Sequence, residues 1–162
     1  MTTNILVLCT HNSARSVLAE AMFNHWAKTL GVDAEAYSAG ASPSGRIHPQ
    51  ALAVLGAAGV NVSGLFSKSM DQFAKADAPE MRVVITVCDS AAAQACPVWP
   101  GAPVRAHWSY PDPSEAPESE QLQRFELTRQ AIAYRMLRLV QLPFEVLDNA
   151  ALQPLVHRVG ES

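Results

Sequence analysis

Residues 4–16 read Asn-Ile-Leu-Val-Leu-Cys-Thr-His-Asn-Ser-Ala-Arg-Ser, and this stretch decides the fold. Its first five residues form a short, mainly apolar run that contains β-branched residues, which is typical of a buried parallel strand. Small and polar residues follow at 9–16, and apolar residues then recur at helical spacing: Val17, Leu18, Ala21, Met22, Trp26 and Leu30. We therefore predict a strand, a loop and a helix, with Ser13 or Ser16 as the helix N-cap and Gly31 as its C-terminal stop.

Strand-like and helix-like segments alternate along the rest of the chain. Further strands are predicted at 34–38, 81–87 and 104–106, and helices at 49–58, 70–76, 121–141 and within 144–157, where Pro154 interrupts the end. This alternation predicts an α/β fold, with a parallel sheet and helices on both faces. We expect one domain over residues 1–162, with a helical C-terminal tail. Ligands bind outside the carboxyl ends of such strands, so residues 9–16, 88–96 and 107–113 are predicted to share one rim of the sheet.

The charge balance and the cysteine count argue against several classes of protein. In 162 residues, 12 Lys and Arg stand against 15 Asp and Glu, a formal net charge of -3 that gives no sign of a nucleic-acid or membrane partner. No apolar run approaches the ~18 residues that span a bilayer, and the N-terminus lacks the basic segment of a signal peptide. We expect a cytoplasmic protein, whose three cysteines are core thiols or reactive groups rather than a disulfide framework.

The loop at residues 9–16 has the features of an oxyanion site. A loop that enters a helix N-terminus directs free backbone N–H groups to one point, where the helix dipole favours negative charge. The same field favours a thiolate, and such positions lower a cysteine pKa from ~8.5 to ~3.5–7.5. Arg15 adds a planar fork for a tetrahedral anion, Ser16 can donate to the Cys9 sulfur, and Asn12 can brace the loop. In the simpler interpretation, Cys9 is an apolar filler and Arg15 a surface residue of the helix.

Several motifs resemble the low-molecular-weight protein tyrosine phosphatase superfamily, and especially its arsenate reductase branch. They are Val7–Ser16 with Leu18–Ala21, then Tyr37–Gly40, then His107-Trp108 followed by Asp112-Pro113. The resemblance covers most of the chain and implies a four-stranded parallel sheet with flanking helices. It also implies an enzyme of arsenical resistance that reduces arsenate to arsenite. The alternative is a low-molecular-weight phosphatase that hydrolyses phosphomonoesters through a cysteinyl-phosphate.

The resemblance assigns roles to residues of the loop and beyond it. Cys9 would attack the oxyanion, Cys88 would resolve the adduct by attacking Cys9, and Cys96 would take over the resulting disulfide and present it to a reductant. Asp112 would act as general acid. The substrate would bind to the loop residues Thr10, His11, Asn12, Ser13, Ala14, Arg15 and Ser16. From the residues alone, Cys88 and Cys96 are equally well interpreted as buried thiols, and Asp112 as a turn residue.

The resemblance also bears on cofactors and partners. No bound cofactor is expected, because the reductant would be an external thiol system, either thioredoxin or glutathione with glutaredoxin. No metal is expected either, since the histidines and cysteines lack the spacing of a zinc site. Lys68 stands near the position of an aspartate that helps some relatives to hold potassium, and its ammonium group can replace that cation. We expect a monomer.

Some features depart from the family pattern or separate the candidate activities. Tyrosine phosphatases of this superfamily carry aromatic residues after the Asp-Pro pair, whereas residues 114–116 are Ser-Glu-Ala, which suits a small inorganic anion. The gap between Cys88 and Cys96 is one residue longer than in the best-known thioredoxin-coupled pattern, and Ala14 replaces a cysteine common among relatives. A third hypothesis is a sensor of oxyanions or redox state with a degenerate site, but the loop holds every residue that the chemistry needs.

Overall fold

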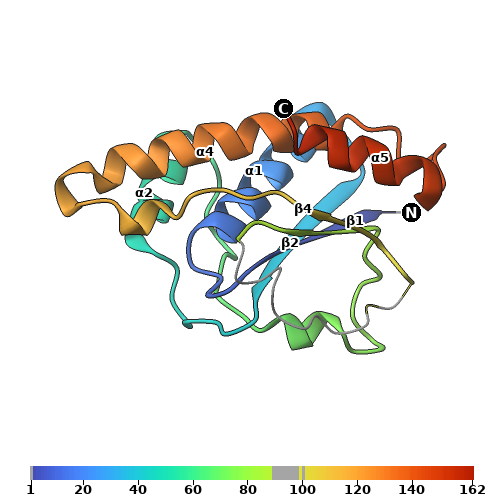
Figure 1. Ribbon diagram of the computed structural model, residues 1–162, viewed down its shortest axis with the longest axis horizontal. Helices are drawn as coiled ribbons and strands as arrows, with labels where there is room; N and C mark the ends of the chain where they lie inside the picture. The colour runs from blue at the N-terminus through green and yellow to red at the C-terminus, as the bar shows by residue number, and fades with distance from the viewer. Residues whose placement is uncertain (1, 89–98, 100) are drawn as a thin grey trace.

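A parallel sheet forms the centre of the molecule (Figure 1). The computed structural model describes residues 2–88, 99 and 101–162. Its four strands are β1 (Thr3–Cys9), β2 (Ala34–Gly40), β3 (Val83–Thr86) and β4 (Val104–His107). They lie in the order β2-β1-β3-β4, and each neighbouring pair is parallel. The predicted four-stranded parallel sheet is therefore confirmed, and each strand lies within two residues of its predicted bounds.

The helices cover the two faces of the sheet unequally. The α-helices are α1 (Arg15–Leu30), α2 (Pro49–Ala57), α4 (Glu118–Val140) and α5 (Asn149–Val159), with short 3-10 helices η1 (Met70–Phe73) and η2 (Pro113–Glu115). Alternate residues of β1 point to opposite faces. Ile5 and Val7 belong to one large apolar cluster with the four α-helices of the described residues, whereas Leu6 and Leu8 pack with Phe73 of η1 on the other face. The face that the α-helices cover therefore carries the main core.

Two details of the helices differ from the sequence predictions, and a third is confirmed. Ser13 and Ser16 are not N-caps, because the cap residue of α1 is Ala14 and Ser16 lies inside the helix, where its hydroxyl accepts from Asn12. Pro154 lies within α5 rather than interrupting its end. Buried apolar side chains on α5 hold the helix on both sides of that proline. The stop at Gly31 is confirmed, since this residue adopts the left-handed conformation with φ 69°.

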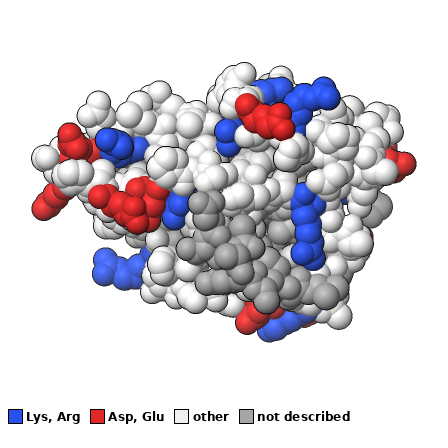
Figure 2. Space-filling model, viewed as in Figure 1, with Lys and Arg blue, Asp and Glu red and all other residues white. Residues whose placement is uncertain are grey.

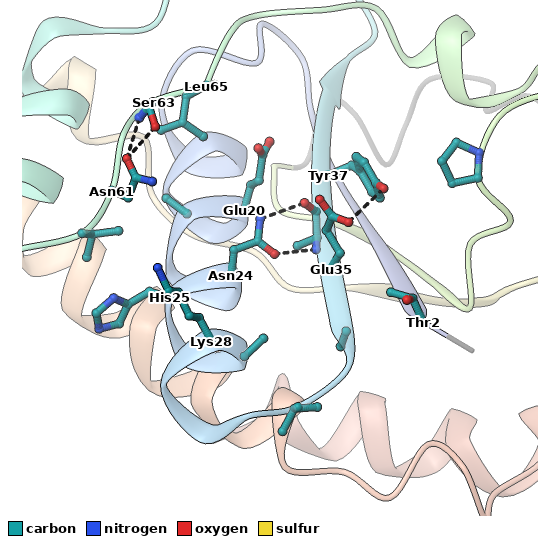
Figure 3. Close-up of a pocket in the computed structure, with 18 of the residues that line it drawn as sticks. Thr2, Glu20, Asn24, His25, Lys28, Glu35, Tyr37, Asn61, Ser63 and Leu65 are labelled. Atoms are coloured by element: carbon teal, nitrogen blue, oxygen red, sulfur yellow. Dashed lines mark hydrogen bonds between the residues drawn. The ribbon is translucent and has the colours of Figure 1, made fainter.

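Polar side chains close both edges of the sheet. At the β2 edge, the amide of Asn24 donates to the Ala36 carbonyl (3.0 Å) and accepts from the Ala36 N–H (2.7 Å), as Figure 3 shows. At the β4 edge, Gln153 of α5 binds the carbonyl (2.8 Å) and the N–H (3.4 Å) of Arg105 in the same way. Each side-chain amide makes the pair of hydrogen bonds that a further strand would make at the outer side of the edge strand. An unpaired edge would otherwise be a template for association.

The surface of the molecule mixes the two kinds of charge. Figure 2 shows basic and acidic side chains interspersed over one face, with acidic ones gathered at its left, where the segment after β4 leads into α4. This segment contains Asp112, Glu115, Glu118 and Glu120. Within the described residues, no helix is long and apolar enough to cross a membrane.

Replacing Asn24 by Ala tests the edge closure. We expect the free energy of unfolding to fall by about 1–3 kcal/mol, because the N–H and carbonyl of the buried Ala36 lose both partners. Asn61→Ala is the matched control, since the Asn61 side chain makes only local, exposed bonds to Ser63, and it should cost about 0.5 kcal/mol or less. Urea denaturation measures both changes. Equal midpoints for the two variants would show that water satisfies the β2 edge as well as Asn24 does.

Candidate active site

The loop between β1 and α1 lies where the connections of the sheet diverge. β1 pairs with β2 on one side and with β3 on the other, so the chain leaves this point in opposite directions. Such switch points open a crevice at the carboxyl ends of the strands. Cys9 ends β1, and Cys88 follows β3 directly beside it. The structure thus brings together two of the predicted cysteines, whereas Cys96 lies outside the described residues.

Asn12 fixes the shape of this loop from the inside. The residue is completely buried and adopts a positive φ of 48°, which asparagine tolerates better than most residues. Its side-chain N–H groups donate to Ser16 Oγ (2.9 Å) and Ser38 Oγ (3.0 Å), and its side-chain oxygen accepts from the Lys68 N–H (2.9 Å). One amide therefore ties the loop to α1, to β2 and to the segment before η1. The predicted bracing role of Asn12 agrees with these contacts.

The carbonyl groups of the loop point toward residues 42–48. Thr10 O accepts from the Ser42 N–H (2.8 Å), His11 O from the Ser44 N–H (3.0 Å) and Ser13 O from the His48 N–H (2.9 Å). The peptide unit is planar, and its N–H points opposite to its carbonyl. The N–H groups that follow these three carbonyls consequently point to the side of the loop opposite to residues 42–48. Successive N–H groups at a helix N-terminus form a site for an anion.

Gly40 lets the next strand approach this loop closely. A Cβ atom at Gly40 would lie 2.7 Å from Thr10 O and 3.1 Å from the backbone nitrogen of Asn12. These are backbone atoms that cannot move aside without deforming the loop. The predicted Tyr37–Gly40 motif therefore has a packing reason, because only glycine fits at its end.

Arg15 is the first residue of α1, and the loop that follows β4 holds its guanidinium in place. Nη1 donates to the Tyr110 carbonyl (2.9 Å), and Nη2 lies 3.6 Å from Asp112 Oδ2. Nε is buried and makes no hydrogen bond within the described part of the chain. A buried guanidinium nitrogen without a partner is costly, and an oxyanion in the loop would satisfy it.

The two carboxylate oxygens of Asp112 have different surroundings. Oδ1 accepts from the N–H (2.9 Å) and the hydroxyl (2.7 Å) of Ser114, which is the turn role proposed from the Pro-Asp-Pro sequence. Oδ2 faces Arg15 at the mouth of the loop. The turn interpretation is therefore confirmed, and the turn leaves the other carboxylate oxygen beside Arg15. The role of Asp112 as general acid stays a prediction. The contact between Tyr110 and Arg15 was not predicted, since a backbone carbonyl leaves no signal in the sequence.

The Cys9 and Cys88 thiols are reduced, buried and in hydrogen-bonding contact. Thr10 approaches Cys88 Sγ with its backbone N–H (3.3 Å) and its hydroxyl (3.4 Å). The hydrogen bond from Cys88 raises the pKa of Cys9 above its ordinary value, and burial raises it further. Arg15 and the backbone at Thr10 act in the opposite direction but are outweighed. The expectation of a lowered Cys9 pKa is therefore wrong for this arrangement, because a second thiol and burial outweigh the groups that favour a thiolate.

A buried ion pair lies behind the loop. Lys68 Nζ is 3.7 Å from Glu20 Oε1, which also accepts from the Ser38 hydroxyl (2.5 Å). Burial raises the pKa of Glu20, and the Lys68 charge opposes that effect. The Lys68 ammonium group thus places a positive charge beside the Glu20 carboxylate, behind the loop. No cluster of three or more His, Cys, Asp and Glu side chains suited to a metal ion occurs among the described residues.

A pocket of about 1150 Å³ lies on the outer side of α1 and does not overlap the thiols. It runs between α1, the β2 edge and the segment at 59–68, and Asn24, His25, Lys28, Glu35 and Tyr37 are among its lining residues (Figure 3). Glu20 also lines it, but Cys9, Arg15 and Asp112 do not. The candidate site is therefore defined by the side chains of Cys9, Arg15 and Asp112, which lie together, and not by the size of a cavity.

Comparisons with known proteins agree with this geometry. Residues 4–150 match the model of the low molecular weight phosphotyrosine protein phosphatase family. An arsenate reductase from Bacillus licheniformis is 36% identical over 140 residues, covering 85% of this chain and 94% of the relative. A glutaredoxin arsenate reductase from Synechocystis is 29% identical over 136 residues, covering 84% and 95%.

Solved structures give the same result. A structure described as an arsenate reductase in the phosphate binding state is 29% identical, with a TM-score of 0.62 over 86% of this chain and 97% of that one. A thioredoxin-dependent arsenate reductase from Corynebacterium glutamicum is 27% identical, with a TM-score of 0.57 over 86% of this chain and 64% of that one.

Replacing Cys88 by Ala tests the effect of one thiol on the other. The pKa of Cys9 should fall, because the substitution removes the hydrogen bond that raises it most. At neutral pH the alkylation of Cys9 by iodoacetamide should then accelerate at least about tenfold, as the reactive thiolate fraction grows tenfold per unit of pKa.

The pH dependence of alkylation in the wild type shows the direction in which the pKa of Cys9 is shifted. With a raised pKa, the alkylation of Cys9 should still increase above about pH 9, where an ordinary cysteine approaches its plateau. Cys88→Ser is the matched control, because its hydroxyl keeps a hydrogen-bonding group beside Cys9 and should accelerate the reaction less. Peptide mapping by mass spectrometry separates Cys9 from the other cysteines. Identical rates in wild type and Cys88→Ala would refute the coupling.

Proposed function

Because the chain belongs to the low molecular weight phosphotyrosine protein phosphatase family, we propose that it is an enzyme that reduces arsenate to arsenite. The observation that carries the proposal is the contact of two thiols, Cys9 and Cys88, at the mouth of a loop built for an oxyanion. Phosphoryl transfer needs only one such thiol. A second thiol in contact with the nucleophile completes a dithiol, whose oxidation to a disulfide supplies the two electrons that the reduction of As(V) requires.

Arsenate binds in the loop in this proposal. Residues 10–16 surround the anion, and the backbone N–H groups at the start of α1 point at its oxygens. Arg15 supplies the nearest positive charge, with Nε available and with Nη1 and Nη2 already oriented by Tyr110 and Asp112. The site needs no overall positive charge, because the helix terminus and one guanidinium act at contact distance.

The first chemical step joins Cys9 to arsenic. The sulfur attacks, an As–O bond breaks, and the balance is RSH + HAsO4²⁻ → RS–AsO3²⁻ + H2O. Asp112, whose Oδ2 faces the loop beside Arg15, is placed to protonate the departing oxygen as general acid. The thiol proton of Cys9 replaces the proton that Asp112 gives up, so the equation balances and no free thiolate is needed before the substrate binds.

The second step transfers the electrons. Cys88 attacks Cys9 Sγ, a disulfide forms, and the S–As bond breaks with its electron pair on arsenic. The balance is R′SH + RS–AsO3²⁻ → RS–SR′ + HAsO3²⁻, in which both sulfurs are oxidised and As(V) becomes As(III). The two donors of Thr10 stabilise negative charge on Cys88 Sγ and so favour its attack.

An external thiol closes the cycle. We assign to Cys96, by family resemblance, the transfer of the disulfide from Cys88 to a reductant. The reductant is thioredoxin or glutathione with glutaredoxin. Relatives that are named for one or for the other support an external thiol system of this kind.

A phosphatase is the second candidate function. Cys9, Arg15 and Asp112 are sufficient for phosphomonoester hydrolysis through a cysteinyl-phosphate, and the paired Arg15 and Asp112 side chains favour that chemistry equally well. The residues after Asp112 are Pro113, Ser114 and Glu115, without an aromatic side chain to clasp a phosphotyrosine ring. This rim favours the smaller substrate.

The Cys88→Ser variant separates the two candidates. Wild-type protein with arsenate should release arsenite when either the thioredoxin or the glutaredoxin system is added, and the productive system identifies the reductant. Release should fall to background in Cys88→Ser, because the adduct on Cys9 has no thiol to resolve it. Hydrolysis of p-nitrophenyl phosphate serves as the control, since it should survive in the variant. No arsenite under any reductant, with equal hydrolysis by both proteins, would leave a phosphatase.

A further inference from the structure

Most of helix α5 lies beyond the part of the chain that the family model matches, because that match ends at residue 150, in the first turn of the helix. We propose that α5 positions Asp112 by clamping the segment 108–112, called the acid loop below, through a contact between Gly160 and Trp108. The inference rests on the proposed function of Asp112. It gives the C-terminal helix a role in the reaction.

Strong contacts fix α5 to the sheet. The Arg82 guanidinium at the start of β3 donates to Asn149 Oδ1 (2.7 Å), to the Phe144 carbonyl (2.9 Å) and to the Leu147 carbonyl. Gln153 seals the β4 edge at Arg105, as described above. The apolar face of α5, which consists of Leu152, Val156 and Val159, is buried in the main core. The helix is therefore a rigid support that extends along β4.

Gly160 ends this support against a buried ring. Its backbone has φ -68° and ψ -12°, which any residue adopts, so no conformational reason demands glycine here. A Cβ atom at this position would instead overlap Cδ1 and Nε1 of Trp108. Trp108 is only 1% exposed, so its ring has no free space into which to move. Glycine is required because the end of α5 lies directly on the tryptophan.

Trp108 begins the acid loop, and the contacts continue from there to the site. Its N–H donates to the Thr86 carbonyl (2.8 Å), and the Tyr110 N–H donates to the Val87 carbonyl (3.3 Å), so the loop follows the end of β3. The Tyr110 carbonyl holds Arg15, and Asp112 faces the same guanidinium. A shift of Trp108 is therefore transmitted over four residues to the carboxylate.

A second contact reaches the acid loop from the same side. The Arg135 guanidinium of α4 lies 4.8 Å from the centre of the buried Tyr110 ring. Nη2 of the same guanidinium donates to the Ser162 carbonyl (3.3 Å), and Ser162 lies two residues beyond Gly160. The segment after α5 thus touches the acid loop directly at Trp108 and indirectly, through Arg135, at Tyr110.

The test compares Gly160→Ala with Gly56→Ala. Both changes add one methyl group to a backbone in the helical region, but a Cβ at Gly56 meets nothing within 4 Å. Hydrogen exchange of peptides that span residues 108–112 should accelerate in Gly160→Ala and not in Gly56→Ala. The kcat for arsenate should fall by between about 5-fold and 100-fold in Gly160→Ala alone, because small displacements of a catalytic group have effects of that size.

A double-mutant cycle separates positioning from a loss of stability. If α5 acts through Asp112, adding Gly160→Ala to Asp112→Asn should cause no further loss of kcat, whereas independent effects would multiply. If Gly160→Ala folds poorly, Gln153→Ala replaces it in the test. This exposed change loosens α5 without a steric clash and should show the same pattern in weaker form.

Unchanged exchange of the acid loop in both α5 variants, or multiplying losses of kcat, would overturn the clamp. Failure of the proposed function gives a different result, namely no arsenite from the wild type. In that case, exchange and the rate of p-nitrophenyl phosphate hydrolysis still decide whether α5 positions Asp112.

Discussion

The side-chain amide of Asn12 makes three hydrogen bonds in complete burial, and the candidate site depends on them. They connect the oxyanion loop to Ser16 in α1, to Ser38 in β2 and to the backbone of Lys68. A buried amide with its partners satisfied is rigid, because any movement would leave polar groups unpaired away from water. The loop can therefore keep its N–H groups turned toward an anion before one is bound. Glu20 and Lys68 extend the network behind the loop, so the support carries one charge of each sign.

The electrostatics of the site are local. A chain with a net charge of -3 does not attract anions through its overall field. The helix terminus and Arg15 act at short range instead, and Arg15 is oriented by a carbonyl and a carboxylate on the opposite side of the site. Cys88 adds a constraint of its own, because its hydrogen bond raises the pKa of Cys9. This effect favours the protonated form of the Cys9 thiol in the absence of a bound anion.

The two edge strands of the sheet bring distant parts of the chain to the candidate site. Edge strand β2 supplies Ser38 and Gly40 to the loop, while edge strand β4 leads into the segment that holds Asp112. Side-chain amides from α1 and α5 complete both edges. Each edge strand of this sheet therefore contributes residues or a following segment to the candidate site. Each edge strand is also held in place by a side chain from a helix.

Local signals in the sequence determined the elements and indicated Cys9 as the candidate nucleophile. The apolar run before Cys9, the helical spacing after Arg15 and the glycine at position 31 each act within a few residues, so their outcome is readable without the fold. The parallel sheet followed from the alternation of strands and helices, and the common rim of Cys9, Cys88 and Asp112 followed from the direction of the strands.

Only the tertiary structure decided the relations between these elements. It showed that Cys88 raises the pKa of Cys9, that a carbonyl of Tyr110 holds Arg15, and that Gly160 is required by a tryptophan 52 positions earlier in the chain. Each of these is a contact between segments far apart in sequence, and two of them involve backbone or absent atoms that carry no side-chain signature. Periodicity reports which face of an element is buried, whereas the partner on that face is set by how the whole chain packs.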